Sequence, residues 1–293
     1  MQALITVFLI ILIGFIAKKF ISIDEKNISD VVLYITTPCL AFVALYKQEL
    51  VLGELANIWI IAFVILILCG LIMKGFLMIT GTKKTGMLLP AMFMNTGYLG
   101  FPVALLAFGE LGLQKAIIFD ALATIAMFSI GVYLVQGKDK RKREKLFEVL
   151  KLPILYGIFF GILANFFAVP VPESILSPLE MIGLATIPLA LIALGAKLAD
   201  IKVTKAVLKI PLLALFVRFA FGFAIAYVLV SFIPLSPMAK NIVLIMAVMP
   251  PAVNSYVINE KYSNSPEEAS VAVLIGTIFS VIPIWLVINA LGF

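Results

Sequence analysis

The sequence predicts an all-α polytopic membrane protein with ten transmembrane helices, arranged as a 5+5 inverted repeat in which helices 4 and 9 are broken. Three numbers favour a membrane protein: 63% of the 293 residues are hydrophobic, 13% are charged, and the mean hydropathy is +1.17. A soluble chain of this size cannot bury so much apolar surface. One span needs about 20 residues, so the chain can supply about nine or ten spans.

Charged residues and Pro/Gly clusters divide the apolar sequence into ten candidate spans joined by short loops. The most polar loop, residues 138–145, fits an orientation-setting cytoplasmic loop better than a partner-binding tail. Lys18 and Lys19 follow the first apolar run instead of preceding it, so this run is expected to be a retained helix. The spans cover about residues 3–20, 31–47, 55–79, 85–109, 115–136, 149–169, 175–198, 209–233, 239–261 and 269–291.

The basic residues give an independent check on this topology. If loop 138–145 is cytoplasmic, 18 of the 22 Lys and Arg residues fall on the cytoplasmic side, and both termini are extracytoplasmic. Lys47, Lys115 and Lys240 fall outside, and Arg218 lies within a span. The net charge of +6 therefore reports orientation, and no nucleic-acid partner is implied.

Residue types also exclude several kinds of site. The chain has no histidine, and its two cysteines, Cys39 and Cys69, fall in apolar stretches where thiols more often fill space than form a bridge. A zinc site and imidazole catalysis are therefore excluded, and neither a metal nor a cofactor is expected.

The chain divides into two repeats of nearly equal length, residues 1–146 and 147–293. Five spans per repeat is an odd number, so the two copies are expected to have opposite orientations, as in many secondary transporters. The matching segments are separated by 147, 150 and 151 residues in chain order, and they are residues 14–20 with 161–167, 36–38 with 186–188, and 128–130 with 279–281.

Spans four and nine contain prolines where a simple helix does not tolerate them. Pro102, Pro250 and Pro251 each leave unpaired backbone groups near mid-membrane, and such groups persist only where protein packs them or a wet cavity receives them. Proline kinks with polar residues that bond neighbouring helices are the alternative. Two breaks at matching positions favour a substrate site, with the candidate binding residues Asn95, Thr96, Gly97, Pro102, Pro250, Pro251, Asn254 and Ser255.

Broken helices also predict the charge of the ligand. Opposed half-helices present backbone N–H groups and positive dipole ends, which favour an anion such as a carboxylate without a buried cationic side chain. Carbonyl ends and Asn or Ser oxygens could hold a cation instead, so a coupling ion stays open at this point.

Four stretches resemble the auxin efflux carrier family, including its bacterial members: residues 95–102, Asp120, residues 249–254 and residues 279–283. The resemblance implies a fold similar to that of bile-acid sodium symporters, with a scaffold domain from helices 1, 2, 6 and 7. A transport domain from helices 3–5 and 8–10 would contain crossing helices 4 and 9.

The resemblance further implies elevator-type alternating access, homodimers and organic-anion substrates: indole-3-acetate in plants, and malate or malonate among bacterial relatives. Loop 138–145 is much shorter than the central loop of many plant carriers. Regulation through that loop is therefore not expected here.

Other polar residues are weaker candidates. Asp120 is placed near the outer end of its span, where interfacial exposure is favoured over a coupling role, and Glu260 is expected at an exposed edge. Arg218 either snorkels to the inner surface or serves as an interior counter-ion. Pathway, hinge and ordinary packing roles stay open for Thr36, Thr37, Pro38, Thr186 and Pro188.

The predicted function is that of a secondary transporter, not an enzyme, in the cytoplasmic membrane. It would move a small organic anion, auxin-like or malate/malonate-like, with the lipid bilayer and a second copy of the chain as partners. The alternative is a sodium- or proton-coupled uptake symporter. A channel or sensor is less favoured because no polar pore stripe or signalling domain is visible, and an intramembrane enzyme lacks a nucleophile with its base.

Overall fold

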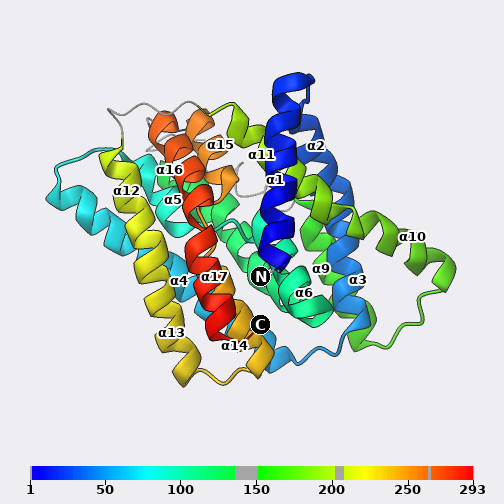
Figure 1. Ribbon diagram of the computed structural model, residues 1–293. Helices are drawn as coiled ribbons and strands as arrows, with labels where there is room; N and C mark the ends of the chain where they lie inside the picture. Colours follow the sequence, from blue (N-terminus) through cyan, green and yellow to red (C-terminus); the bar gives the residue numbers. More distant parts are fainter. Residues whose placement is uncertain (1, 136–150, 202–207, 263–264, 293) are drawn as a thin grey trace.

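The computed structural model describes residues 2–135, 151–201, 208–262 and 265–292, and the regular elements of these ranges are helices (Figure 1). The basic loop 138–145 lies outside the described residues. The first half of the chain contains α1 (Gln2–Phe20), α2 (Glu25–Val31), η1 (Val32–Thr36), α3 (Thr37–Lys47), α4 (Leu52–Ile79), η2 (Thr85–Met87), α5 (Leu88–Met92), η3 (Thr96–Gly100), α6 (Phe101–Ala126), η4 (Met127–Gly131) and α7 (Val132–Val135).

The described residues of the second half are also helical. It contains α9 (Pro153–Phe166), α10 (Glu173–Leu184), α11 (Thr186–Ala199), α12 (Lys209–Phe216), η7 (Val217–Phe221), α13 (Gly222–Phe232), α14 (Pro237–Ala247), α15 (Val253–Tyr262), α16 (Pro266–Phe279) and α17 (Val281–Ala290).

Among the described residues, six helical stretches are long and apolar enough to span a membrane, and the bent pair α16 and α17, with 41° between its helices, makes up to seven. Two shorter apolar helices, α9 and α14, add to these. Large apolar side chains such as Phe159, Phe216 and Phe232 are exposed on the outside of the bundle, where a soluble protein would place polar groups. The chain is therefore an all-helical, multi-pass membrane protein.

The second helical stretch begins earlier than the sequence pattern predicts. We expected a span over residues 31–47, whereas α2, η1 and α3 form one stretch from Glu25 to Lys47. The Asp24 carboxylate caps its start, accepting hydrogen bonds from the backbone N–H groups of Lys26 at 3.0 Å and Asn27 at 3.3 Å. This cap brings the polar segment before residue 31 into the helix.

The longest helical run, Thr96–Val135, changes direction at Gly109. Gly109 has φ 70° and ψ −165°, a conformation that glycine adopts without steric cost. The turn falls at the predicted end of the fourth candidate span, residues 85–109.

Helices of the two repeats pack closely on one side of the molecule, where α1 lies along α11 and α3 along α9. A Cβ atom on Gly195 would lie 2.0 Å from the carbonyl oxygen of Ile11, and one on Gly157 would lie 2.3 Å from that of Pro38. Glycine allows these backbones to approach, as small residues do between many membrane helices. Figure 1 shows α1, α3, α9 and α10 on the right and α4, α12 and α13 on the left.

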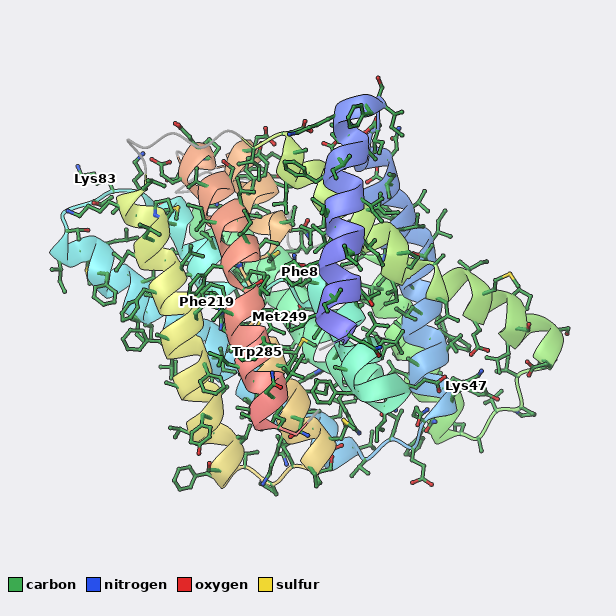
Figure 2. The ribbon with its side chains drawn as sticks, viewed as in Figure 1. Phe8, Lys47, Lys83, Phe219, Met249 and Trp285 are labelled. Atoms are coloured by element: carbon green, nitrogen blue, oxygen red, sulfur yellow. The ribbon has the colours of Figure 1, made fainter. Side chains whose placement is uncertain are left out.

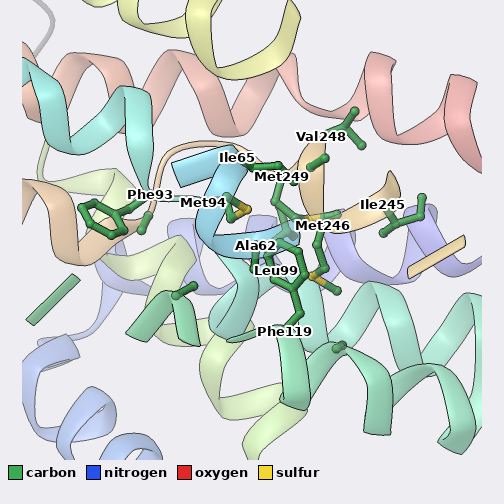
Figure 3. Close-up of a cluster of buried hydrophobic side chains, with 14 of the residues drawn as sticks. Ala62, Ile65, Phe93, Met94, Leu99, Phe119, Ile245, Met246, Val248 and Met249 are labelled. Carbon is green, nitrogen blue, oxygen red and sulfur yellow. The ribbon is translucent and has the colours of Figure 1, made fainter. Parts of the chain in front are cut away.

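An apolar cluster surrounds the two segments at which helices are interrupted. Met94 of the first interruption and Met249 of the second are 2% and 0% exposed, and they lie together with Ile65 of α4 (Figure 3). The interruptions are therefore buried in protein and do not face lipid.

Candidate functional site

The two helix interruptions lie side by side and satisfy each other's backbone groups. The first separates α5 from η3 and the second separates α14 from α15, and Met94 and Pro251 form an antiparallel bridge between them. The N–H of Asn95 donates to the carbonyl of Pro250 at 2.7 Å, and the N–H of Ala252 donates to that of Phe93 at 2.9 Å. Two backbone N–H groups and two carbonyl groups of the interruptions are thus paired across the two repeats.

A cavity of about 230 Å³ lies at the N-terminal ends of the helices that follow the interruptions. Asn95, Thr96 and Gly97 line it from the first interruption, and Val253 and Asn254 line it from the second. The first turn of a helix leaves backbone N–H groups without intrahelical acceptors and carries the positive end of the dipole. Two such helix starts therefore meet at one cavity.

Among the side chains that line this cavity, Asn95 is the strongest candidate for a ligand-binding hydrogen-bond donor. It is only 2% exposed, yet its Nδ2 has no hydrogen-bond partner among the described residues. An unpaired buried amide is costly, so a ligand or water that accepts its hydrogen bond is expected to be favoured there.

Asp120 also lines the cavity, and the expectation that it is exposed at the interface is wrong. Its residue exposure is 5%, the Thr96 hydroxyl donates a hydrogen bond to one carboxylate oxygen, and the Thr124 hydroxyl donates to the other at 3.2 Å. The helix turns back at Gly109, about three turns before Asp120, which places this residue deeper than the sequence pattern suggested.

The described residues that line this cavity include two acidic residues, Asp30 and Asp120, and no Lys or Arg. A second hollow of about 450 Å³ shares Asp30, Tyr98 and Asn254 with it and extends to Lys26 and Lys197. The two hollows are therefore adjacent.

The predicted prolines and Ser255 shape the site from outside the cavity. Pro102 lies in the first turn of α6, and Pro250 and Pro251 belong to the paired interruption. The Ser255 hydroxyl donates to the carbonyl of Ala252 at 2.6 Å. The described cavity lining includes none of these four residues.

Arg218 is fully buried, at 0% exposed, so it does not snorkel to a surface. Its guanidinium donates to the carbonyl of Met92 at 2.8 Å and to that of Ala247 at 3.2 Å, which are the last residues of α5 and α14. It therefore contacts the carbonyl ends of the helices that precede the interruptions, on the side away from the N–H ends.

Of the two Thr-x-Pro segments, residues 36–38 and 186–188, some residues join the repeats or line the cavity and others do not. The Thr186 hydroxyl donates to that of Thr36 at 2.8 Å, which joins the two repeats. Thr37 and Thr186 line the cavity, whereas the Pro38 carbonyl packs against Gly157 and Pro188 is exposed. Glu260 is exposed, as expected, and lines the second hollow.

Four polar lining residues among the described residues were missed as candidates: Asp30, Tyr34, Tyr98 and Thr124. Thr124 follows Asp120 by four residues, a spacing that places both on one helix face and could have identified it. Asp30 gave no such signal, because the segment before residue 31 was assigned to a connection.

The fold and this site define a membrane protein built from two helical repeats whose interruptions meet at a buried cavity. A family model described as "Membrane transport protein" matches the chain twice, over residues 1–146 and 143–288. The chain therefore belongs to this family, the auxin efflux carrier family, whose members are transporters and not enzymes. The two matches also agree with the division into two repeats.

Similar proteins include transporters from archaea and a bacterium. The chain is 28% identical to an uncharacterized transporter of Methanocaldococcus jannaschii, over 99% of each chain, and 28% identical to one of Methanothermobacter thermautotrophicus, over 67% of each. It is 25% identical to a protein of Rhizobium meliloti named "Putative malonate transporter", over 64% of this chain and 61% of that protein.

Proposed function

We propose that this transporter is a secondary carrier for a small organic anion and that the anion binds at the paired helix interruptions. The observation that supports this most directly is the cavity at two helix N-terminal ends, which is lined by Asn95, a residue whose amide nitrogen has no hydrogen-bond partner among the described residues. Backbone N–H groups and an amide donor suit a carboxylate, and no buried cationic side chain is needed. The name of the Rhizobium meliloti relative, which refers to malonate, makes a small dicarboxylate the first solute to test.

The proposed mechanism is elevator-type alternating access between two bodies. The scaffold consists of α1, α2–α3, α9 and α10–α11, through which two copies of the chain associate, and the transport body consists of α4–α7 and α12–α17. Residues from both bodies line the cavity: Thr37 and Thr186 from the scaffold, and Asn95, Asp120 and Asn254 from the transport body. Movement of one body against the other would therefore change access to the bound anion.

We propose ten spans in a 5+5 inverted repeat, with the fourth and ninth broken and crossing. The 40-residue run Thr96–Val135 would be about 60 Å long if straight, twice the thickness of a bilayer core, and its turn at Gly109 divides it into parts of two spans. The interrupted pair α14 and α15 makes one span, and the short helix α9 makes another.

Orientation follows from the positive-inside rule, with both termini extracytoplasmic and loop 138–145 cytoplasmic in the cytoplasmic membrane. Figure 2 shows Lys83, assigned inside, near one end of the molecule and Lys47, assigned outside, near the other. Single cysteines at Arg141, Val203 and Ser236 test this assignment, in a chain whose Cys39 and Cys69 are replaced. The first two should react with a membrane-impermeant thiol reagent only from the cytoplasm and the third only from outside. Reaction of Arg141→Cys and Ser236→Cys from the same side would contradict it.

Transport itself is tested in proteoliposomes. The purified chain should exchange external radiolabelled malonate or malate for the same unlabelled solute inside, and empty liposomes should not. A panel of monocarboxylates, dicarboxylates and indole-3-acetate, offered as competitors, defines the class. Counterflow of cationic or neutral solutes, with none of any organic acid, would contradict the proposal.

A sodium- or proton-coupled uptake symporter is the second candidate, and the cavity's acidic side chains favour it. An anion entering beside Asp30 and Asp120 is repelled unless a cation or proton enters with it. The other titratable side chains that line this cavity in the described residues are Tyr34 and Tyr98. Imposed gradients of sodium, protons and voltage distinguish the two candidates: uptake driven above equilibrium by a sodium or proton gradient supports coupling, and equilibration without accumulation supports facilitated exchange.

A further inference from the structure

Arg218 is the largest fully buried side chain of the described residues, and the proposed anion site does not use it. It lies in η7, in the middle of the helical stretch that runs from Lys209 to Phe232. Its Nη1 donates to the carbonyl oxygen of Met92 at 2.8 Å and approaches that of Ala91 at 3.5 Å, and its Nη2 donates to that of Ala247 at 3.2 Å. One side chain thus reaches backbone oxygens of both repeats.

The charge of this guanidinium is balanced by backbone and not by an acidic side chain. Among the described residues, no carboxylate lies within the 4.0 Å that defines an ion pair with Arg218. The last carbonyls of a helix lack intrahelical donors and carry partial negative charge. Such oxygens from α5 and α14 converge on one point, where a positive charge is favoured and an empty space would be costly.

Converging carbonyl oxygens are the ligand type that binds small cations, because oxygen donors replace the hydration shell of the ion. We propose that the carbonyl oxygens of Ala91, Met92 and Ala247 form a monovalent-cation site and that the Arg218 guanidinium is its permanent, tethered occupant. The paired interruptions therefore need no metal ion to hold their carbonyl ends together. When the tether is removed, a free guanidinium-type or alkali cation takes its place.

The position of the guanidinium depends on Gly222, the first residue of α13 and one turn after Arg218. A Cβ atom on Gly222 would lie 2.0 Å from Nη2 and 2.8 Å from Cζ of Arg218. The side chain therefore lies flat along its own helix, over the space that glycine leaves. An added methyl group would displace the guanidinium and leave every charge in the protein unchanged.

The first test uses thermal unfolding of the purified chain in detergent, which requires no transported solute. Arg218→Ala should lower Tm by on the order of 10 °C, because a buried charge partner is lost. Methylguanidinium chloride at millimolar concentration should recover part of this loss, and sodium chloride a smaller part relative to choline chloride. The Tm of the wild-type protein should not respond to either cation. The Tm of Arg218→Lys, which keeps the charge, should lie between those of wild type and Arg218→Ala.

Two controls separate a cation site from simple packing. Tetramethylammonium chloride at equal concentration is too large to enter and should leave the Tm of Arg218→Ala unchanged. Arg218→Met replaces the stem with apolar volume and no charge. If Arg218→Met melts at or above the wild-type temperature, or if Arg218→Ala responds alike to methylguanidinium and tetramethylammonium, the proposal is wrong.

Gly222→Ala keeps the proposal open to contradiction if the neutral variants do not fold. Alanine normally stabilises a helix relative to glycine, so Tm should rise if only helix propensity matters. The proposal expects the opposite sign, a lower Tm, because the guanidinium is pushed from the carbonyl oxygens. Gly75→Ala in α4, where an added Cβ meets nothing within 4 Å, is the matched control and should raise Tm or leave it unchanged. An unchanged or raised Tm in Gly222→Ala overturns the proposal.

The proposal is independent of which solute is carried. If it holds, wild-type transport does not require sodium at the carbonyl ends, whichever organic acid is accepted. Its failure in the unfolding experiments leaves the proposed anion carrier intact, and failure of every organic acid in proteoliposomes leaves the unfolding result intact.

Discussion

The paired interruptions have a carbonyl side, where α5 and α14 end with partial negative charge, and an N–H side, where η3 and α15 begin with partial positive charge. The protein fills the first side and leaves a cavity at the second. On the carbonyl side, the Arg218 guanidinium donates to the ends of α5 and α14. On the N–H side, the starts of η3 and α15 meet a cavity of about 230 Å³. One side is closed by the protein's own cation, and the other is left open.

This difference bears on where the proposed solute would bind. Both sides need a counter-charge, because broken helices expose dipole ends in a medium that does not solvate them. On the carbonyl side the Arg218 guanidinium supplies the counter-charge, and on the N–H side the bound solute would supply it. The solute-binding region is therefore expected to be confined to the N–H side.

The largest expected effect comes from placing a fixed negative charge on the N–H side. Asn254→Asp adds a carboxylate in the first turn of α15, where it lines the cavity. Because an anion would then meet a like charge, its apparent affinity should fall about a hundredfold or more, measured as the concentration of half-maximal exchange in proteoliposomes.

The fold should be little affected by the same substitution, since the helix N-terminus favours an acidic residue while Asp30 and Asp120 in the same cavity disfavour it. Tm should therefore stay close to the wild-type value, and Asn254→Ala serves as the neutral control. Unaltered or improved anion affinity in Asn254→Asp would place the solute elsewhere or make it a cation.

The next largest effect tests the unpaired amide on the same side. Asn95→Ala removes the Nδ2 donor, which has no partner among the described residues, and should weaken anion affinity by about 1–3 kcal/mol, or up to roughly a hundredfold. Protein stability should change little, because no protein hydrogen bond of that nitrogen is lost. Competition with a labelled organic acid measures the affinity. Native affinity in a correctly folded variant would remove Asn95 from the proposed site.

Much of the fold was accessible from sequence because its signals are local. Apolar length predicted a multi-pass membrane protein, and Pro250 and Pro251 predicted the second interruption, since proline removes a backbone donor wherever it stands. Pro102 did not locate the first interruption, because it lies within the helical run Thr96–Val135. The start at Glu25 was missed because a capped, polar first turn resembles a loop when only hydropathy is considered.

The site was less accessible because its geometry depends on pairs distant in sequence. Arg218 meets carbonyls 126 and 29 residues away in the two repeats, and no periodicity links them. Asp120 was placed at the surface because the turn at Gly109 sets its depth, and one glycine in an apolar run gives little sign of φ 70°.

A smaller effect is expected when the pairing between the two interruptions is disturbed from α16, which packs against Pro251. A Cβ atom on Gly276 of α16 would lie 2.6 Å from Cδ of Pro251 and 2.7 Å from a methyl group of Leu215. Gly276→Ala should therefore cost about 1–3 kcal/mol of stability, as overpacking does. It should also lower turnover, because Pro251 belongs to the bridge that joins both sides.

Thermal unfolding and exchange rates measure the two effects of Gly276→Ala. Gly75→Ala is the control, since nothing lies within 4 Å of its added methyl group. A Tm at or above the wild-type value in Gly276→Ala would mean that the bridge tolerates displacement. In that case close packing of α16 against Pro251 does not fix the position of the two interruptions relative to each other.

The smallest effect is expected at a polar contact between the repeats that belongs to neither side. The Thr186 hydroxyl donates to the Thr36 hydroxyl at 2.8 Å, and the Thr36 side chain is buried and does not line the cavity. Thr36→Val keeps the shape of the side chain and removes the acceptor, so it should cost about 0.5–1.5 kcal/mol of stability. Thr186 lines the cavity, so water there can accept its hydroxyl proton and limit the loss. Anion affinity should equal that of wild type, measured in the same competition experiment as Asn95→Ala. A change in affinity larger than the change in stability would show that this contact between the repeats takes part in solute binding, and the division between a closed carbonyl side and an open N–H side would then have to include it.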